Sequence, residues 1–296
     1  MTDWLLTHQA SLQSYLLLGS FACAAVWETF LPRRPFAMPL GPRWFNQLAL
    51  TAFGSLLVRL SMPLAGFALA LLVQQEGWGL FNHVALPAWL TLMLGVIVID
   101  LGGYAQHRLF HAVPLLWRFH QIHHCDLDVD CGTAIRHHPV ETLLGQGIDL
   151  ALIVAFGIPP LAVLAALTLG GIASVFNHAN VALPGPADRV LRRFFVTPDM
   201  HRIHHSTDFA ESNRNFANLF PWWDRLFATY QREPRLGHSE MPLGLPELRS
   251  AGDVTLWKLL VLPLRPLPVA ATDEHRGSTS PPSAAQLATI WSKEKT

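Results

Sequence analysis

The sequence predicts an all-α integral membrane protein with about four to five transmembrane or hairpin helices and a cytoplasmic helical cap that carries a polyhistidine site for two metal ions. Two observations predict this class. First, 51% of the 296 residues are hydrophobic, only 14% are charged, and the mean hydropathy is +0.28, whereas an ordinary soluble domain has roughly 25% charged residues. Second, eleven of the fifteen histidines fall between His107 and His205.

Four apolar zones supply the predicted spans, at residues 12–31, 48–73, 86–104 and 143–176. Each of the first three approaches the ~20 residues that a helix needs to cross a bilayer. Arg59 and Pro63 interrupt the second zone, and a snorkelling arginine and a kinked helix accommodate them. The alternative is a set of core helices in a soluble protein, which the scarcity of charge disfavours. Residues 1–88 are therefore predicted to be membrane anchor helices.

The fourth zone predicts a helical hairpin. Its 34 residues would form a helix about 51 Å long, which is too long for a hydrocarbon core of ~30 Å. Gly157-Ile158-Pro159-Pro160 stands in its middle and is a turn signal. A hairpin returns the chain to the side from which it came. This return allows His178 and the histidines near His201 to meet those near His107 and His120.

The arginines predict the orientation. Arg33, Arg34 and Arg43 lie between the first two zones, and seven more lie in the histidine-rich segments, whereas residues 74–86 contain no basic residue. Because cytoplasmic loops carry an excess of Lys and Arg, we expect the histidines to face the cytoplasm, at the inner membrane of a bacterium. No Lys or Arg precedes the first zone, so residues 4–31 are expected to be a retained anchor rather than a cleaved signal peptide.

The last part of the chain has a different composition. Residues 270–296 are rich in Ser, Thr, Pro and charge, which predicts a disordered tail. Residues 89–269 are left as the domain that carries the histidines.

The histidines repeat two spacings that predict a metal site. On a helix, residues at i, i+3 and i+4 lie on one face, and imidazole suits zinc, copper, iron and nickel. Packing alone does not explain the repeat, because each buried neutral imidazole needs a hydrogen-bond partner. The three boxes are His107-x-x-x-His111, His120-x-x-His123-His124 and His201-x-x-His204-His205.

Other residues near the boxes are further candidates. His178 follows the predicted hairpin on the side of the boxes, so we expect it to be a ligand. His138, in preference to His137, is a possible ligand or orienting partner. Metal-bound histidines usually donate their second N–H to a carboxylate or carbonyl, and Asp100 and Asp199 stand next to boxes. The alternative for each of these carboxylates is a helix cap or a solvated loop residue.

Several function classes are disfavoured. The net charge is zero, so there is no electrostatic footprint for nucleic acid. Three cysteines are too few for a disulfide framework. Cys125 and Cys131 could be ligands, but they form no Cys-x-x-Cys pair, and small buried residues are the favoured interpretation. The chain also contains no His-Glu-x-x-His motif of zinc proteases and no glycine-rich dinucleotide fingerprint.

The boxes and their flanking residues resemble the membrane fatty acid hydroxylase and sterol desaturase superfamily. The resemblance covers residues 90–232, roughly, and is specific because the elements occur in a fixed order. Small departures are Cys125, where serine is common, and Ala217 and Ala228, where glycine is frequent. The flanks are Leu116-Trp-Arg-Phe-His120, Arg136-x-His-Pro-x-Glu141, Thr197-Pro-Asp-Met-His201 and Trp222-Trp-Asp-Arg-Leu-Phe227.

The resemblance implies an enzyme, with residues 89–269 as its catalytic domain. Such an enzyme holds two iron ions without haem and uses O2 as co-substrate with two electrons to oxidise a C–H bond of a sterol, fatty acyl chain or related lipid from the bilayer. Hydroxylation and desaturation both stay open. The electrons come from a separate carrier, a ferredoxin or a cytochrome b5-like protein. The implied ligands are His107, His111, His120, His123, His124, His178, His201, His204 and His205.

Three other functions stay open on the residues alone. A membrane metal transporter or sensor is the first, but its sites lie near the bilayer midplane, whereas these boxes lie at predicted helix ends. A haem protein with two histidine ligands is the second, and clustered triplets suit it poorly. A zinc-dependent membrane hydrolase is the third, because the histidines do not identify the metal.

Overall fold

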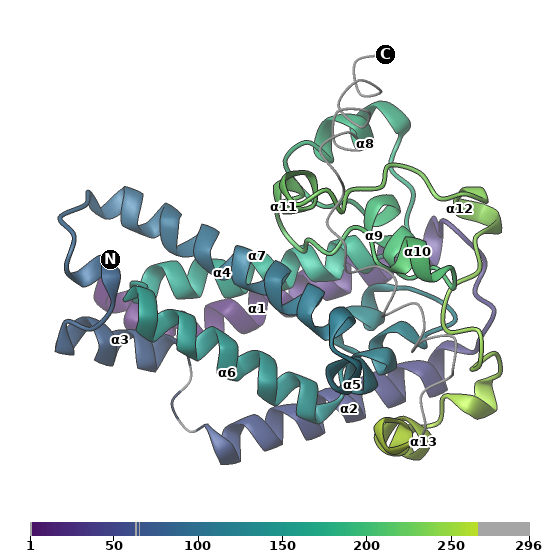
Figure 1. Cartoon of the computed structure of the whole chain (residues 1–296), viewed down its shortest axis with the longest axis horizontal. Coiled ribbons are helices and arrows are strands. Elements are labelled where there is room, and N and C mark those ends of the chain that lie inside the picture. The colour runs from purple at the N-terminus through teal and green to yellow at the C-terminus, as the bar shows by residue number, and fades with distance from the viewer. Residues whose placement is uncertain (1, 63, 65, 266–296) are drawn as a thin grey trace. The chain divides into compact units, whose positions relative to one another are not determined.

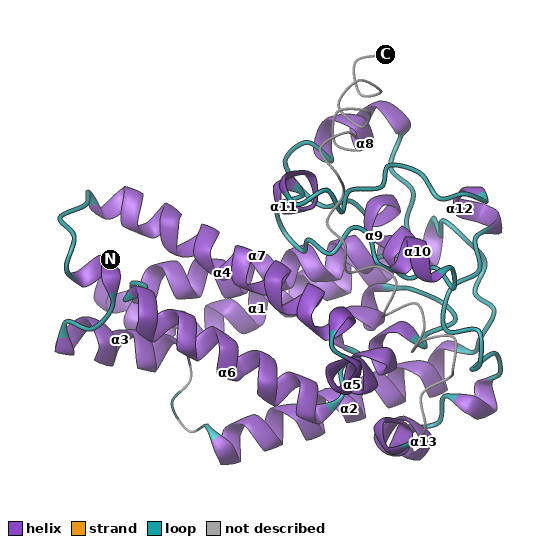
Figure 2. Cartoon of the chain, in the orientation of Figure 1, coloured by secondary structure: helices purple, strands orange, loops and turns teal. Residues whose placement is uncertain are grey.

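The computed structural model describes residues 2–62, 64 and 66–265. Every regular element in these ranges is helical, and β-structure is limited to isolated bridges (Figure 2). The chain divides into a compact unit, Met1–Pro263, and a second unit, Leu264–Thr296. The all-α prediction is therefore confirmed. The predicted disordered tail, residues 270–296, lies outside the described residues.

Five segments of the described chain are long and apolar enough to cross a membrane, as expected from the four zones. The fold is thus that of an all-α membrane protein. The segments are Thr7–Phe30 within α1 (Thr2–Phe30), Leu40–Asn82 with α2 (Leu40–Ser61), α3 (Gly66–Glu76) and η1 (Leu80–Asn82), then α4 (Ala88–Ala112), α6 (Pro139–Phe156) and α7 (Pro160–His178).

The hairpin forms at the predicted turn. Gly157 ends α6 with a φ of +65°, a backbone conformation that favours glycine. A Cβ atom on Gly157 would also lie 2.6 Å from the carbonyl oxygen of Trp78. Pro160 then occupies the first turn of α7, where its missing N–H costs no hydrogen bond. As a result α7 ends at the same end of the bundle at which α6 begins (Figure 1).

The two arms of the hairpin are splayed around other helices. Both α3 and α4 pack against α6 and against α7, and α1 packs along α7. Small residues allow close contact, since a Cβ atom on Gly95 of α4 would lie 2.7 Å from that of Ala162. Large apolar side chains on the outer faces, such as Tyr15, Leu60 and Trp89, are exposed, as expected for surfaces that contact lipid tails.

The remaining helices are short and gather at the end of the bundle opposite the start of α1 (Figure 1). Together they form the cap. They are α5 (Pro114–His124), η2 (Cys131–Ile135), α8 (Gly185–Leu191), α9 (Pro198–His204), α10 (Phe209–Ser212), α11 (Trp222–Leu226), α12 (Gly237–Glu240), η3 (Ala251–Asp253), α13 (Leu256–Val261) and η4 (Leu262–Leu264).

A buried ion network joins α2 to the segment after α5. The Arg43 guanidinium lies 3.0 Å from Asp126 and 2.9 Å from Asp130, and all three side chains are buried. Burial alone would raise the pKa of Asp126, but Arg43 and Arg136 lower this pKa to about 2. Asp130 in turn caps η2 by accepting the N–H groups of residues 132 and 133. This network fixes the chain that follows the second histidine box.

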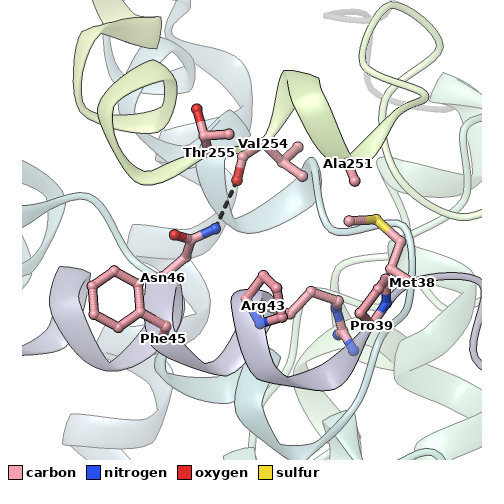
Figure 3. Close-up of a pocket in the computed structure, with 9 residues that line it drawn as sticks. Met38, Pro39, Arg43, Phe45, Asn46, Ala251, Val254 and Thr255 are labelled. Atoms are coloured by element: carbon pink, nitrogen blue, oxygen red, sulfur yellow. Dashed lines mark hydrogen bonds between the residues drawn. The ribbon is translucent and has the colours of Figure 1, made fainter.

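The C-terminal part of the cap rests on the start of α2. A cavity of about 160 Å³ lies between them, lined mainly by apolar side chains such as Met38 and Phe45 (Figure 3). Asn46 donates a hydrogen bond to the carbonyl oxygen of Val254 at 2.8 Å across its edge. Its lining within the described chain contains no histidine.

Candidate metal centre

The nine predicted ligands lie together in two groups at the cap end of the bundle. Within each group, one nitrogen of every ring lies within 4.8 Å of those of the others. All but His107 are buried, and His107 is partly buried. The first histidine group is His107, His111, His120, His124 and His204; the second histidine group is His123, His178, His201 and His205.

Helical spacing divides each triplet box between the two groups. In α5, His120 and His124 are four residues apart and join the first group, whereas His123 joins the second. Residues at i and i+4 differ by about 40° around a helix, and residue i+3 lies about 60° away on the other side of residue i. The third box divides in the opposite way. His204 joins the first group, whereas His201 and His205, which are four residues apart, join the second. Each of these two boxes thus contributes histidines to both groups.

The Nε2 atoms of the first group converge. The Nε2 atom of His107 lies 3.1 Å from that of His120 and 2.9 Å from that of His204. The Nε2 atoms of His111 and His124 are 3.0 Å apart. Two nitrogens bound at right angles to one metal ion, each at about 2.1 Å, would also lie about 3.0 Å apart.

The second group has the same arrangement around His178. Its Nε2 atom lies 3.1 Å from that of His123 and 3.1 Å from that of His201. The ring of His205 packs against these rings, with its centroid 4.7 Å from that of His123. Neither nitrogen of His205 has a hydrogen-bond partner among the described residues. A buried imidazole without partners is costly, and a metal ion would satisfy it.

Backbone carbonyl groups fix the ring tautomers. The Nδ1 atom of His107 lies 2.7 Å from the carbonyl oxygen of Phe216, and that of His204 lies 2.8 Å from the carbonyl oxygen of Arg214. A carbonyl oxygen only accepts, so Nδ1 carries the proton and Nε2 of the neutral ring presents a lone pair. The same holds for His178, whose Nδ1 donates to the carbonyl oxygen of Ser174 at 2.7 Å.

The converging lone pairs need a cation. Burial first, and then the neighbouring imidazoles, lower the pKa of five histidines outside the spans well below the usual value, so protons do not supply this charge near neutral pH. Metal ions that prefer imidazole would supply it, and the residues present therefore fit such ions. The five are His123, His124, His201, His204 and His205.

Glu141 is the orienting carboxylate that the sequence analysis did not select. Its Oε1 atom accepts from Nδ1 of His120 at 2.7 Å and from Nδ1 of His137 at 3.0 Å. The ring of His137 stacks on that of His123, with centroids 4.8 Å apart. The i, i+4 spacing of His137 and Glu141 was the available signal.

His138 and Asp199 lie outside both groups. The Nδ1 atom of His138 accepts from the N–H of Val140 and caps α6, and its Nε2 atom faces the carbonyl oxygen of Leu260 at 3.3 Å. Asp199 pairs with Arg202 of its own helix and with Arg33 of the segment after α1. These contacts are structural and hold α6 and α9 in place.

Asp100 acts on the site only indirectly. Its carboxylate accepts from Nε1 of Trp223 at 2.7 Å and from the N–H groups of Leu219 and Phe220, each at 3.3 Å. It thereby ties the segment after residue 215 to α4. That segment supplies the Phe216 carbonyl that orients His107.

Asp224 is a second anchor that the sequence analysis missed. It is fully buried and accepts from the N–H groups of Phe216 and Ala217, at 2.9 and 3.0 Å, and from the Thr229 hydroxyl at 2.7 Å. Its place in the Trp-Trp-Asp-Arg flank was the available signal. Cys125, in contrast, donates to the carbonyl oxygen of Ile122 and belongs to neither histidine group.

Comparison with known proteins identifies the family. The family model described as fatty acid hydroxylase matches residues 92–229, which contain all nine histidines of the two groups. The chain belongs to the fatty acid hydroxylase family. No solved structure matches it.

Curated relatives are similar over parts of their length. An ornithine lipid hydroxylase of Rhizobium tropici is 31% identical over 231 residues, which are 74% of this chain and 66% of that protein. Alkylglycerol monooxygenase of Homo sapiens is 30% identical over 53% of this chain and 34% of its own length. Methylsterol monooxygenase 1 of Rattus norvegicus is 28% identical over 50% of each chain. This chain therefore spans about one third to two thirds of the relatives that it matches.

Proposed function

We propose that this protein is a membrane-bound, O2-dependent lipid hydroxylase in which the two histidine groups hold two iron ions. The observation that carries the proposal is the convergence of imidazole Nε2 atoms in two adjacent histidine groups, in a chain of this family. When bound, the iron ions would supply the activation of O2 that attack on a C–H bond requires.

The protein side chains would position these ions and exclude water. The carbonyl groups of Phe216, Arg214 and Ser174 hold three imidazoles in the tautomer that binds metal. Glu141 does the same for His120, because its carboxylate accepts from Nδ1 of that ring. A charged acceptor at Nδ1 makes the Nε2 atom of His120 a better metal ligand. Because the rings are buried, the ions would be shielded from bulk water.

Hydroxylation is favoured over desaturation. The relatives bear the names of hydroxylases and monooxygenases, and the molecules in those names are an ornithine lipid, an alkylglycerol and a methylsterol. For this chain we infer a lipid substrate, with a sterol, fatty acyl or related C–H bond as the point of attack. The reaction would consume one O2, two electrons and two protons and would yield an alcohol and water.

The electrons would come from a separate protein, a ferredoxin or a cytochrome b5-like carrier. The three cysteines of the chain are too few for the four thiolates of an iron–sulfur cluster. The arginines on the cap side favour a site that faces the cytoplasm, and the similarity to a bacterial hydroxylase favours the inner membrane of a bacterium. The position of both histidine groups at the ends of spans, rather than at their middle, speaks against a transporter.

The test is metal analysis and lipid profiling with the full chain in a bacterial membrane. We expect about two iron ions per chain and a lipid that gains one oxygen atom from 18O2. His204→Ala should abolish this product, whereas His83→Ala, at an exposed position in the η1 loop, should not. A zinc-loaded protein that hydrolyses lipids without O2, or metal flux into proteoliposomes, would refute the proposal.

A further inference from the structure

A second cavity lies on the membrane side of the histidine groups. It has a volume of about 190 Å³ and opens between α4, α6, α7 and residues 218–219. Its walls are formed by apolar side chains and glycines, and its polar side chains are Asp100, Asp149 and Asn218. Since a water molecule occupies about 30 Å³ of liquid, the cavity can hold a small polar group with a few methylenes, but not a whole lipid.

Two of the three polar side chains are engaged by the protein. Asp100 accepts from Trp223 and from two backbone N–H groups. Asn218 donates to the carbonyl oxygen of Gly170 at 2.9 Å and accepts from Asn177 at 3.0 Å. Both therefore serve to hold the cap segment against α4 and α7.

Asp149 is different. No hydrogen bond or ion pair to Asp149 occurs within the part of the chain that the structure describes, and no Lys, Arg or His is among the residues that line its cavity. Asp149 lies near the middle of α6, one of the candidate spans. A carboxylate at such a depth is costly, and acidic residues in spans usually face a substrate or ion pathway.

We propose that Asp149 binds the primary amine of the lipid substrate. The cavity holds two carboxylates and no protein cation, so an ammonium group would complement its charge, and the apolar walls formed by Val96, Ile99 and Leu167 suit the adjoining methylenes. The role of this lipid as a substrate rests on the proposed hydroxylase function, whereas the binding of an amine lipid does not.

The position of Asp149 separates amine recognition from chemistry. Asp149 lies eight residues after Glu141 on α6, which is about 12 Å along a helix, and Asp100 lies seven residues before His107 on α4, which is about 10 Å. The amine would thus be held roughly 10–12 Å from the metal centre. The C–H bond that reacts belongs to a different part of the same lipid.

The test is equilibrium binding to the purified, full-length, metal-free protein in phosphatidylcholine nanodiscs. The probes are a radiolabelled lipid with a free primary amine and its N-acetylated form. We expect the wild type to bind the amine lipid at least tenfold more tightly than the N-acetylated lipid. Asp149→Asn should bring this ratio of affinities close to one, and Asp149→Glu should keep part of the preference. Glu76→Gln, an exposed acid on α3, should leave the ratio unchanged.

Two outcomes would overturn the site: equal binding of both probes by the wild type, or an unchanged ratio in a folded Asp149→Asn protein. An unchanged melting temperature of the variant would show that it is folded. The binding assay needs no turnover. An amine preference that depends on Asp149, in a protein that makes no oxygenated lipid when loaded with iron, would support the site and refute the hydroxylase function. Oxygenation of the amine lipid and of its N-acetylated form at equal rates would support the hydroxylase function and refute the amine site.

Discussion

The Nδ1 atom of His120 lies 2.7 Å from Oε1 of Glu141. The same oxygen accepts from His137, whose ring stacks on His123 with an interplanar angle of 7°. His120 belongs to the first histidine group and His123 to the second. One buried carboxylate therefore supports both groups, and its removal should affect both metal positions.

Replacement of Glu141 by alanine should weaken metal retention by about 10- to 100-fold, because orienting carboxylates contribute about this much to metal affinity. The measurement is iron content after dialysis against a graded series of chelator concentrations. Glu247→Ala, at an exposed acid in the cap, is the matched control. Equal retention by both variants would show that Glu141 does not act on the metal centre.

Stability of the metal-free protein should fall as the pH drops below about 6.5. Burial and neighbouring imidazoles hold the pKa of His123, His124, His201, His204 and His205 low in the folded state, whereas the unfolded chain takes up protons near pH 6.5. The unfolded state then binds more protons, so unfolding becomes easier at lower pH.

Each such histidine should contribute up to about 1.4 kcal/mol per pH unit below that point, and nothing above about pH 7.5. Thermal unfolding of the chelator-treated protein between pH 7.5 and 5.0 measures this effect. A melting temperature that does not change over this range would contradict the buried, neutral state of the imidazoles.

The sequence predicted the hairpin from a local turn signal, and the hairpin together with the family resemblance predicted that the nine histidines gather at one end of the bundle. Gly157-Ile158-Pro159-Pro160 is a turn signal that is read from four consecutive residues, and i, i+4 pairs share a helix face. The number of spans followed in the same way from the length and hydropathy of each zone.

The orienting carboxylates could not be chosen in this way, because proximity along the chain differs from proximity in space. Asp199 stands two residues before His201, and two residues turn a helix by about 200°. The Asp199 carboxylate therefore lies on another face of the helix than His201 and pairs with Arg202 and Arg33. Asp100 shares a face with His107 but lies about 10 Å away along the helix. Glu141 reaches His120 only because α5 packs against α6, which no local pattern shows.

Gly157→Ala should destabilise the α6–α7 hairpin by about 2 kcal/mol or more. The left-handed conformation costs an alanine about 1 kcal/mol, and the added Cβ atom would lie 2.6 Å from the carbonyl oxygen of Trp78. The melting temperature of the protein in detergent measures the effect. Gly19→Ala in α1, where a Cβ atom meets nothing within 4 Å, should be neutral or stabilising, and an equal response of both variants would argue against the turn geometry.

His205→Leu should have opposite effects on the metal-free and the metal-loaded protein. His205 is fully buried, and both its nitrogens lack partners in the described chain, so an apolar side chain of similar size removes a desolvation cost of about 1–3 kcal/mol. We expect a higher melting temperature than wild type in chelator. With iron, the wild type should gain stability by binding, and the variant should gain less because the second group has lost a ligand.

Matched melting curves with chelator and with iron test this crossover. Ser14→Ala in α1, at an exposed position, is the control. Its melting temperature should rise with iron by as much as that of the wild type. A variant that is less stable without metal, yet shows the full iron-dependent shift, would mean that His205 is a packing residue and that the second group binds its ion through His123, His178 and His201 alone.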